Sequence, residues 1–264
     1  MISTAHLQAD IRSWWREHPV VLLRDLIQRS LLFPALRWLC RPLAVEGVER
    51  LDGVHGPVIF VANHSSHFDT LLVLSVLPRE VRRRTAVAAA ADYFFCGCIR
   101  GAVVSLLVNA FAFKRNGCSC RSVGRCQEIL RGGGSLLIFP EGGRSPDGRL
   151  QRFKSGIGLL ATALGVPVVP IHLRGTRDLL PKGGLLPRRG AVAVRVGEPV
   201  RYDRDADPIA VAGDLRSRVL ELGGKIRLDI GHEKRHDPRE DAAVSAVPLP
   251  RSGQRRCDND PVLS

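Results

Sequence analysis

The stretch that decides the fold reads PVIFVANHSSHFDTLLVL, from Pro57 to Leu74. Its first six residues are an uninterrupted apolar run, which predicts a short buried strand. Its last five residues, from Thr70 onward, are typical of the opening of a helix. The segment between them, Asn63 to Asp69, is therefore expected to be a strand-to-helix turn that contains His64.

His64 and Asp69 are five residues apart. On one continuous helix this spacing turns two side chains about 140° away from each other, so they could not meet. If the helix begins at Ser65 or Ser66, however, His64 lies outside it and can fold back over the first turn. A carboxylate on one imidazole nitrogen holds the ring in one tautomer and leaves the other nitrogen free to accept a proton. The spacing therefore allows a general base.

A purely structural interpretation of the same residues is also open. Ser66 can serve as the N-cap of the helix, with Asp69, three residues later, as its capping-box partner. His64 and His67 are then ordinary turn residues. The rest of the chain has to decide between the two interpretations.

Apolar runs and helical segments alternate along the remaining chain. This alternation predicts an α/β fold with a mixed, largely parallel sheet covered by helices on both faces. Ligands of such sheets bind beyond the carboxyl ends of the strands. His64 and the loop from Glu141 to Arg144 each follow a strand, so both are expected to line one crevice. Strands are expected at 57–62, 85–91, 135–139, 165–173 and 191–196, and helices at 122–130, 153–164 and 207–228.

Residues 7–42 contain all three tryptophans and many leucines, and Pro19 separates two expected short helices. The second helix has a polar face of Arg24, Asp25, Gln28 and Arg29, and an apolar face of Leu22, Leu23, Leu26, Ile27 and Phe33. Charged residues interrupt the segment too often for a membrane span. We expect this amphipathic pair to lie on a membrane surface, with tryptophans at headgroup depth and arginines toward the phosphates. The alternative is a helical hairpin packed on the domain itself.

The chain is expected to have three parts. Residues 1–43 hold the amphipathic helices, and residues 44–231 hold the α/β domain, which starts with a connector over 44–56. Residues 232–264 are rich in Pro, Arg, Asp and Ser and are expected to be disordered.

The formal net charge is +13, and six Lys and Arg balance six Asp and Glu from residue 232 onward. The whole excess therefore lies on residues 1–231, where it suits anionic lipid headgroups, phosphorylated substrates or nucleic acid. The sequence lacks the interleaved aromatic and basic residues that stack bases. Nucleic-acid binding would also leave the tryptophan-rich start unexplained, so we expect no nucleic-acid partner.

The chain has seven cysteines, an odd number, and starts without the basic and apolar regions of a signal peptide. A reduced, cytosolic compartment is therefore expected. Two C-x-C pairs, Cys96/Cys98 and Cys118/Cys120, raise the possibility of a zinc site. Structural zinc sites usually have longer spacings between paired cysteines, and no histidine lies close by in the sequence. We expect no metal.

The segment EGGRS, from Glu141 to Ser145, has the features of an anion site. Its two glycines let backbone N–H groups approach a ligand, Arg144 lies beside them, and a helix start is expected soon after, near Lys154. The order of residues differs from that of a nucleotide-binding P-loop. Arg115 supplies a second possible clamp for an anion.

With these features in place, the chain resembles the glycerolipid acyltransferase family, whose founding members acylate lysophosphatidic acid. Four ordered motifs carry the resemblance, which covers about residues 40–225. They are the His-x4-Asp box at His64 and Asp69, a Phe-rich strand ending in Arg at 111–115, the Phe-Pro-Glu-Gly box at 139–142 with Arg144 and Ser145, and Val-Pro-x-x-Pro at 166–170.

The resemblance implies transfer of a fatty acyl group from an acyl-CoA or acyl-carrier-protein thioester to the hydroxyl of a lysophospholipid, with 1-acyl-glycerol-3-phosphate as the expected acceptor. It implies His64 as the general base, oriented by Asp69, and no cofactor besides the thioester. The sequence has no Gly-x-Ser-x-Gly elbow, which fits direct transfer without an acyl-enzyme. The residues expected to hold the acceptor are Arg115, Glu141, Gly142, Gly143, Arg144 and Lys154.

The resemblance further implies a peripheral protein on the cytoplasmic face of an anionic membrane. The Val166–Pro170 motif is expected to help build the acyl-chain or acceptor channel. The uncharged run from Gly101 to Phe113 is either core or a surface that meets an acyl chain or lipid.

Two departures from the family pattern, Gly143 in place of a usual Thr and Lys114 in place of a common acidic residue, leave other lipid acceptors open. A non-catalytic lipid-binding module of the same fold is a further alternative, although it would be expected to lose His64 or Asp69.

Overall fold

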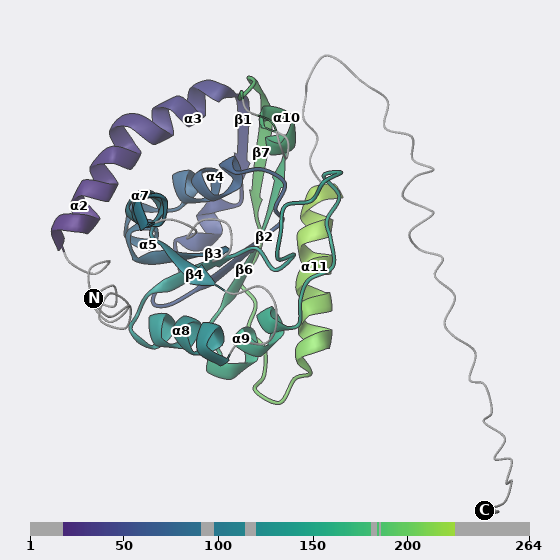
Figure 1. Ribbon diagram of the computed structural model, residues 1–264. Helices are drawn as coiled ribbons and strands as arrows, with labels where there is room; N and C mark the ends of the chain where they lie inside the picture. The colour runs from purple at the N-terminus through teal and green to yellow at the C-terminus, as the bar shows by residue number, and fades with distance from the viewer. Residues whose placement is uncertain (1–17, 91–97, 114–119, 181–183, 185, 225–264) are drawn as a thin grey trace, which may run out of the picture. The chain divides into compact units, whose positions relative to one another are not determined.

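The computed structural model describes residues 18–90, 98–113, 120–180, 184 and 186–224. Its centre is a seven-stranded sheet in the order β1-β7-β6-β2-β5-β3-β4 (Figure 1). All neighbouring strands are parallel except β6 and β7, so the predicted mixed, largely parallel sheet is confirmed. The strands are β1 (Cys40–Glu46), β2 (Ile59–Ala62), β3 (Thr85–Ala90), β4 (Ala110–Phe113), β5 (Ser135–Ile138), β6 (Val168–Arg174) and β7 (Gly190–Val196).

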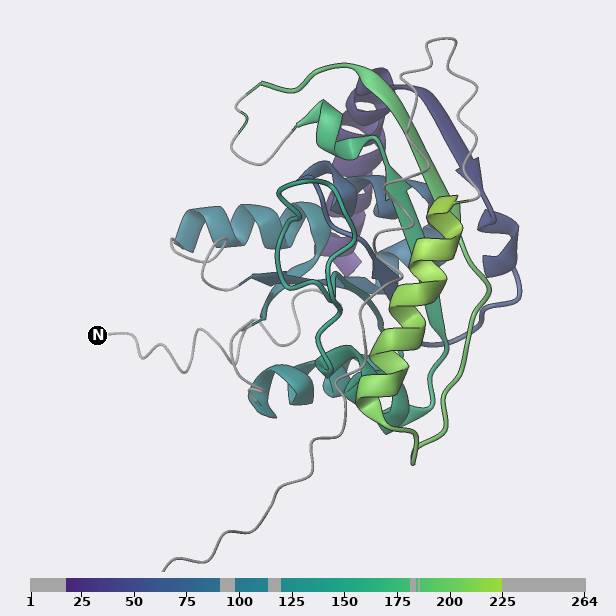
Figure 2. The same ribbon diagram turned by 90° about the vertical axis from the view of Figure 1, so that its right-hand side faces the viewer.

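Helices cover both faces of this sheet, as Figures 1 and 2 show from two sides. Side chains alternate along β2, so Phe60 belongs to one buried cluster while Ile59 and Val61 belong to the other. The first cluster includes residues of α3 (Phe33–Leu39) and α4, and the second includes residues of α8, α9 and α11. The helices are α4 (Phe68–Val76), α5 (Arg79–Arg84), α7 (Cys98–Val108), α8 (Cys120–Arg131), α9 (Gly156–Leu164), α10 (Thr176–Leu179) and α11 (Pro208–Gly224), with a 3-10 turn η2 (Val48–Leu51).

The uncharged run 101–113 divides into the end of α7 and the core strand β4. Asn109 separates them, because its backbone adopts the left-handed conformation with φ of 56°. Its side-chain amide donates a hydrogen bond of 2.9 Å to the carbonyl of Thr85 in β3. The run is thus partly core, as one of the two interpretations expected, although Val103 on α7 is 47% exposed.

The N-terminal segment is one continuous helical rod made of α2 (His18–Ile27), a π-helical turn η1 (Gln28–Leu32) and α3 (Phe33–Leu39). Pro34 accounts for the π turn, because it has no N–H to donate to the carbonyl four residues earlier. The neighbouring N–H of Phe33 instead reaches the carbonyl of Gln28, five residues back. The helix expected before Pro19, with Trp14 and Trp15, lies outside the described residues.

The predicted orientation of this amphipathic helix was wrong. Arg24, Asp25 and Gln28 are buried against the α/β domain, so most of the polar face points inward, and Arg24 cannot meet lipid phosphates. Arg29, the fourth residue assigned to that face, is exposed. Phe33, assigned to the apolar face, is buried as well. The large apolar side chains that the rod exposes are Leu22, Leu23, Leu26, Leu31 and Trp38.

Specific polar contacts explain why the polar face is buried. Arg24 Nε donates a hydrogen bond of 2.8 Å to the carbonyl of Leu106, and Gln28 Nε2 donates one of 2.8 Å to the carbonyl of Leu107. These carbonyls lie in the last turn of α7, where no helical partner is available and a positive charge is favoured. The N-terminal rod therefore supplies hydrogen-bond donors to the last carbonyls of α7, and its leucines point outward.

The edge strand β1 was not predicted. Residues 40–46 were divided between the helical segment and a connector, so the expected domain boundary at 43/44 falls inside β1. This strand reads CRPLAVE and is largely exposed, because it pairs only with β7 at the edge of the sheet. An edge strand with Arg and Pro lacks the apolar pattern that identified the central strands.

Among the described residues, no helix combines the length and the apolarity that crossing a bilayer requires. The expected tail at 232–264 lies outside the described residues.

Candidate active site

The two sequence motifs expected to share a crevice follow neighbouring strands. His64 comes two residues after β2, and Glu141 comes three residues after β5, which pairs with β2 in parallel. The backbone N–H of His64 donates a hydrogen bond of 2.6 Å to Glu141 Oε1. The N–H of Ser145 donates one of 2.8 Å to the carbonyl of His64. The loops are therefore in direct contact, as the sequence predicted.

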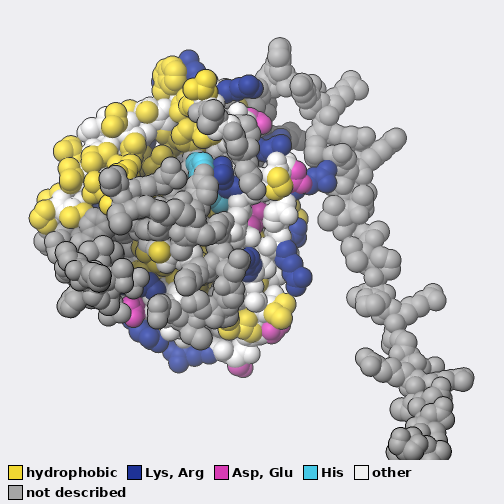
Figure 3. Space-filling model, viewed as in Figure 1, with side chains coloured by type: hydrophobic (Ala, Val, Ile, Leu, Met, Phe, Trp, Pro, Cys, Tyr) yellow, Lys and Arg dark blue, Asp and Glu magenta, His cyan; other side chains and the backbone are white. Residues whose placement is uncertain are grey.

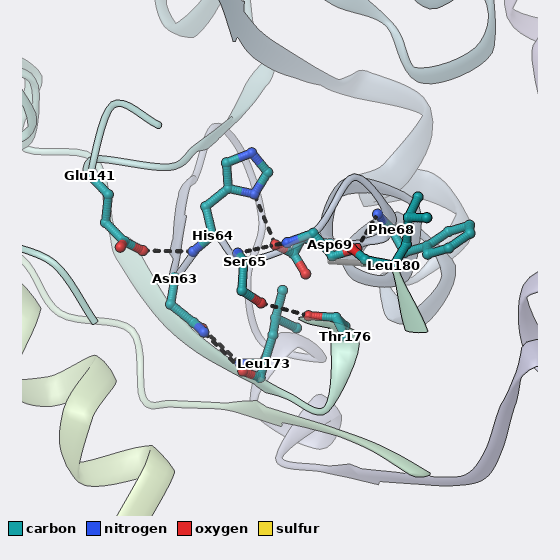
Figure 4. Close-up of polar contacts among 10 residues, drawn as sticks. Asn63, His64, Ser65, Phe68, Asp69, Glu141, Leu173, Thr176 and Leu180 are labelled. Carbon is teal, nitrogen blue, oxygen red and sulfur yellow. Dashed lines mark hydrogen bonds and ion pairs between the residues drawn. The ribbon is translucent and has the colours of Figure 1, made fainter. Parts of the chain in front are cut away.

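His64 and Asp69 meet as the spacing allowed. The His64 Nδ1 and Asp69 Oδ2 atoms are 2.8 Å apart, and the Asp69 side chain is fully buried (Figure 4). The helix α4 begins at Phe68, two or three residues after the Ser65 or Ser66 start considered for the fold-back, so His64 lies outside the helix and can fold back over its start. With the carboxylate on Nδ1, the neutral ring carries its proton there and keeps a lone pair on Nε2. The predicted contact between His64 and Asp69 is present, and the role of His64 as a general base stays a prediction.

The structural interpretation of Asp69 also holds in part. Asp69 Oδ2 accepts the backbone N–H groups of Ser65 and Ser66 at 2.6 and 2.8 Å. The Ser66 hydroxyl, however, bonds mainly to the carbonyl of Leu180, at 3.0 Å, and is 3.4 Å from the N–H of Phe68. Asp69 thus stabilises the start of α4 and holds His64 at the same time. The two interpretations are not exclusive.

The ring of His64 is also fixed on one face. It stacks on Phe139 with 4.2 Å between ring centroids and 22° between ring planes. The His64 side chain retains 18% of its exposure. Among the described residues, none forms a hydrogen bond with His64 Nε2.

The anion side of the predicted site lies next to His64. Gly142 has φ of 75°, and a Cβ there would come 2.9 Å from Lys154 Nζ, so the ammonium lies over the glycine turn. Arg144 directly precedes Ser145, whose N–H bonds to the carbonyl of His64, so Arg144 lies near the His64 turn. Burial, followed by the charge of Arg144, lowers the pKa of His67 to about 4. Gly143 is partly buried in the same loop. Arg115 lies outside the described residues.

Glu141 occupies an unexpected position for a residue expected to hold the acceptor. Its Oε1 accepts the N–H of His64, and its Oε2 accepts the N–H of Gln151 at 3.0 Å. Burial raises the pKa of the Glu141 carboxyl, and these two backbone hydrogen bonds oppose the rise. The carboxylate therefore faces the protein backbone on both sides.

Sequence reasoning missed the residues that support the turn from β6. Asn63 Nδ2 donates to the carbonyl of Leu173, and the N–H of Leu173 donates to Asn63 Oδ1, both at 2.8 Å. The hydroxyls of Ser65 and Thr176 are 2.9 Å apart (Figure 4). The one available signal was a polar Asn directly between a buried strand and His64. The Val166–Pro170 motif lies buried at the start of β6, and its predicted role in a channel stays a prediction.

No group of three or more metal-binding side chains occurs within the described ranges. Cys126 is buried in α8, where burial raises the pKa of its thiol to about 12. Cys96 and Cys118, one member of each C-x-C pair, lie outside the described residues. The zinc hypothesis gains no support from the part of the chain that is described.

Comparisons with known proteins point to one family. The sequence profile of the family described as Acyltransferase matches residues 26–174, more than half of the chain. The chain is 32% identical over 214 residues to a chloroplast 1-acyl-sn-glycerol-3-phosphate acyltransferase of Brassica napus, covering 77% of this chain and 59% of that protein. It is 33% identical over 215 residues to an Arabidopsis thaliana enzyme of the same name, covering 77% and 57%. The chain thus spans less than three-fifths of the length of these relatives.

A solved structure is similar as well. The crystal structure of the 1-acyl-sn-glycerophosphate acyltransferase PlsC from Thermotoga maritima superposes with a TM-score of 0.58 at 28% identity, covering 77% of this chain and 82% of that one. The profile match includes the His64–Asp69 turn and the Glu141–Ser145 loop. The chain belongs to the acyltransferase family.

Proposed function

We propose that this protein transfers a fatty acyl group from a CoA or acyl-carrier-protein thioester to the hydroxyl of a lysophospholipid, 1-acyl-glycerol-3-phosphate. The observation that carries the proposal is the His64–Asp69 pair, with its Nδ1 to Oδ2 distance of 2.8 Å, next to a loop that contains Arg144. The relatives named 1-acyl-sn-glycerol-3-phosphate acyltransferases support the same acceptor.

In this proposal His64 acts as a general base. Its Nε2 takes the proton of the acceptor hydroxyl while the oxygen attacks the thioester carbonyl carbon. The new C–O bond forms, the C–S bond breaks, and the departing thiolate takes the proton back from the imidazolium. Asp69 keeps the proton of the neutral ring on Nδ1 and stabilises the imidazolium. No acyl-enzyme is formed.

The phosphate of the acceptor is held on the loop side of the site. Lys154, whose Nζ lies over Gly142, and Arg144 supply positive charge, while Gly142 and Gly143 let backbone N–H groups approach the phosphate oxygens. Arg115 adds a further cation in this proposal. Gly143 provides no side-chain hydroxyl, so the acceptor is recognised by charge and backbone donors.

The protein acts as a peripheral protein at the cytoplasmic face of an anionic membrane. The outward leucines and Trp38 form an apolar surface, which Figure 3 shows as hydrophobic side chains gathered where α2 and α3 lie in Figure 1. Arg189 lies over the Trp38 ring with its Cζ 4.5 Å from the centroid. Exposed arginines at the α3 end of this surface, Arg37, Arg41, Arg188 and Arg189, suit anionic headgroups.

The catalytic proposal is tested with purified protein, labelled acyl donor and a panel of lysolipids. Each lysolipid is offered with acyl-CoA and with acyl-carrier protein, which identifies the donor and the acceptor. His64→Ala is expected to lose about 10²–10⁴ of the rate. His55→Ala, an exposed histidine outside the turn, is the matched control. Equal product with and without His64 would remove His64 as the general base.

The membrane proposal is tested by flotation with vesicles that contain phosphatidic acid. Leu23→Lys combined with Leu26→Lys is expected to reduce binding at least tenfold, because two charges enter the exposed apolar surface. Leu220→Lys on α11 is the control, since Leu220 is similarly exposed at 50%. Unchanged flotation of the double variant would remove this surface from the membrane contact.

A further inference from the structure

His64 is held at its backbone as well as at its ring. Its N–H donates to Glu141 Oε1 at 2.6 Å, and its carbonyl accepts the N–H of Ser145 at 2.8 Å. Both contacts come from one loop, 77 or more residues away in the sequence. Figure 4 shows the Glu141 side chain pointing at the His64 backbone, on the opposite side from Asp69.

The need for this clamp follows from the end of β2. The last strand pairs of β2 are Val61 with Ile138 of β5 and Ala62 with Ile171 of β6. His64 lies beyond them, so the sheet no longer holds its backbone. A buried N–H without an acceptor costs about 1–3 kcal/mol, and a carboxylate is a stronger acceptor than a neutral carbonyl. Glu141 thus replaces a strand neighbour.

The carboxylate is itself fixed from its other side. Glu141 Oε2 accepts the N–H of Gln151 at 3.0 Å, ten residues further along the chain. Nearby, the N–H of Lys154 donates a hydrogen bond of 3.0 Å to the carbonyl of Pro140. This bond joins the two ends of the loop. Each oxygen of Glu141 therefore has a backbone donor, and the side chain joins the glycine loop to the His64 turn.

We propose that Glu141 is a positioning residue, which holds the backbone of His64, and is not a ligand for the polar end of the acceptor. This inference rests on the proposed function of His64 as the general base. A misplacement of about 1 Å can cost on the order of 10² in rate, so a contact with the backbone of the base affects catalysis without touching substrate.

Glu141→Gln separates the two roles. The amide keeps one oxygen acceptor and the size of the side chain, but its NH2 group faces one of the two backbone N–H groups. For a positioning residue, the rate constant kcat falls about tenfold to a hundredfold while the KM for the acceptor stays the same. For a residue that binds the acceptor, KM rises and kcat stays the same.

Hydrolysis of the acyl thioester provides a second readout, because water has no polar end for Glu141 to bind. If Glu141 positions His64, hydrolysis by Glu141→Gln falls by the same factor as acyl transfer. Glu128→Gln, at an exposed position on α8, is the matched control and should change neither rate. A raised acceptor KM with unchanged kcat and unchanged hydrolysis would overturn the inference.

Nuclear magnetic resonance of ¹⁵N-labelled histidine tests the inference without turnover. The wild-type protein is expected to hold neutral His64 with its proton on Nδ1, and Glu141→Gln is expected to add the tautomer with the proton on Nε2. Identical His64 signals in both proteins would contradict the positioning role, whereas a general loss of stability would leave the tautomer unchanged. An inactive wild-type protein with the expected signals would count against the proposed function alone.

Discussion

Two buried aspartates, Asp69 in the His64 turn and Asp25 in the N-terminal helix, show opposite ways of using a buried carboxylate. Asp69 is fully buried and accepts two backbone N–H groups and the His64 ring, all within five residues of itself. Asp25 is 5% exposed and accepts Arg79 Nη2 at 2.7 Å and Arg82 Nη2 at 2.5 Å, more than 50 residues away. The partners, rather than the burial, distinguish the two sites.

The difference in partners determines what each aspartate can do. An arginine keeps its proton at every accessible pH, so the Asp25 cluster can only hold elements together. An imidazole can take up and release a proton, so the Asp69 pair can take part in proton transfer. Asp25 joins α2 to α5 and, together with Arg24 and Gln28 at the end of α7, keeps the polar face of the rod inward.

The largest expected effect is on catalysis at Asp69. Asp69→Asn removes the charge that selects the His64 tautomer, and we expect the acyl-transfer rate to fall by about 10²–10⁴. Rate measurements at saturating donor and acceptor check this, with urea unfolding to confirm that the variant is folded. A variant that keeps its rate would make Asp69 only a helix cap and break the contrast with Asp25.

Asp25→Asn is expected to act on stability instead. It leaves the buried guanidinium of Arg82 without its counter-charge, which should cost about 3 kcal/mol in the free energy of unfolding. Arg79→Gln should cost less, because the Arg79 side chain is 49% exposed and water screens its charge. Urea unfolding of both variants gives the values, and the rate per folded molecule in detergent should not change. A specific rate loss in Asp25→Asn would show that the rod supports catalysis.

Asn63→Leu tests whether the local turn depends on a distant strand. It leaves both the N–H and the carbonyl of Leu173 without their partners, which should cost about 2 kcal/mol. Because Asn63 directly precedes His64, we also expect kcat to fall about tenfold. Unfolding and kinetic measurements on the same preparation check both effects. A stability loss with unchanged kcat would mean that Asp69 and Glu141 hold His64 without help from β6.

The smallest expected effect is the pH dependence of the Asp25 cluster. Burial favours the neutral acid, but hydrogen bonds and charge from Arg79 and Arg82 outweigh it and lower the pKa of Asp25 below its ordinary value. The stabilisation is therefore present above the unfolded value of about 3.9 and is lost as pH falls below it. The difference in unfolding free energy between wild type and Asp25→Asn should shrink below about pH 4. A constant difference from pH 6 to pH 3 would contradict this origin.

The elements that sequence analysis predicted well are those specified by neighbouring residues. The apolar run of β2 and the turn after it contain the whole His64–Asp69 pair. The carboxyl ends of parallel strands lie at one edge of a sheet, which was enough to bring Glu141 next to His64. The edge strand β1 was missed, because one side of it lacks a strand neighbour and its residues do not form an apolar run.

By itself the sequence determined the α/β alternation, the central strand, the turn with His64 and Asp69, and the glycine loop, because each depends on residues a few positions apart. Only the tertiary structure decided that the polar face of the rod is buried, that Asn63 bonds to β6, and that Glu141 faces the His64 backbone. Those partners lie 54 to 110 residues away in the chain. A local pattern specifies how side chains repeat along an element, whereas the surface that an element packs against depends on the whole fold.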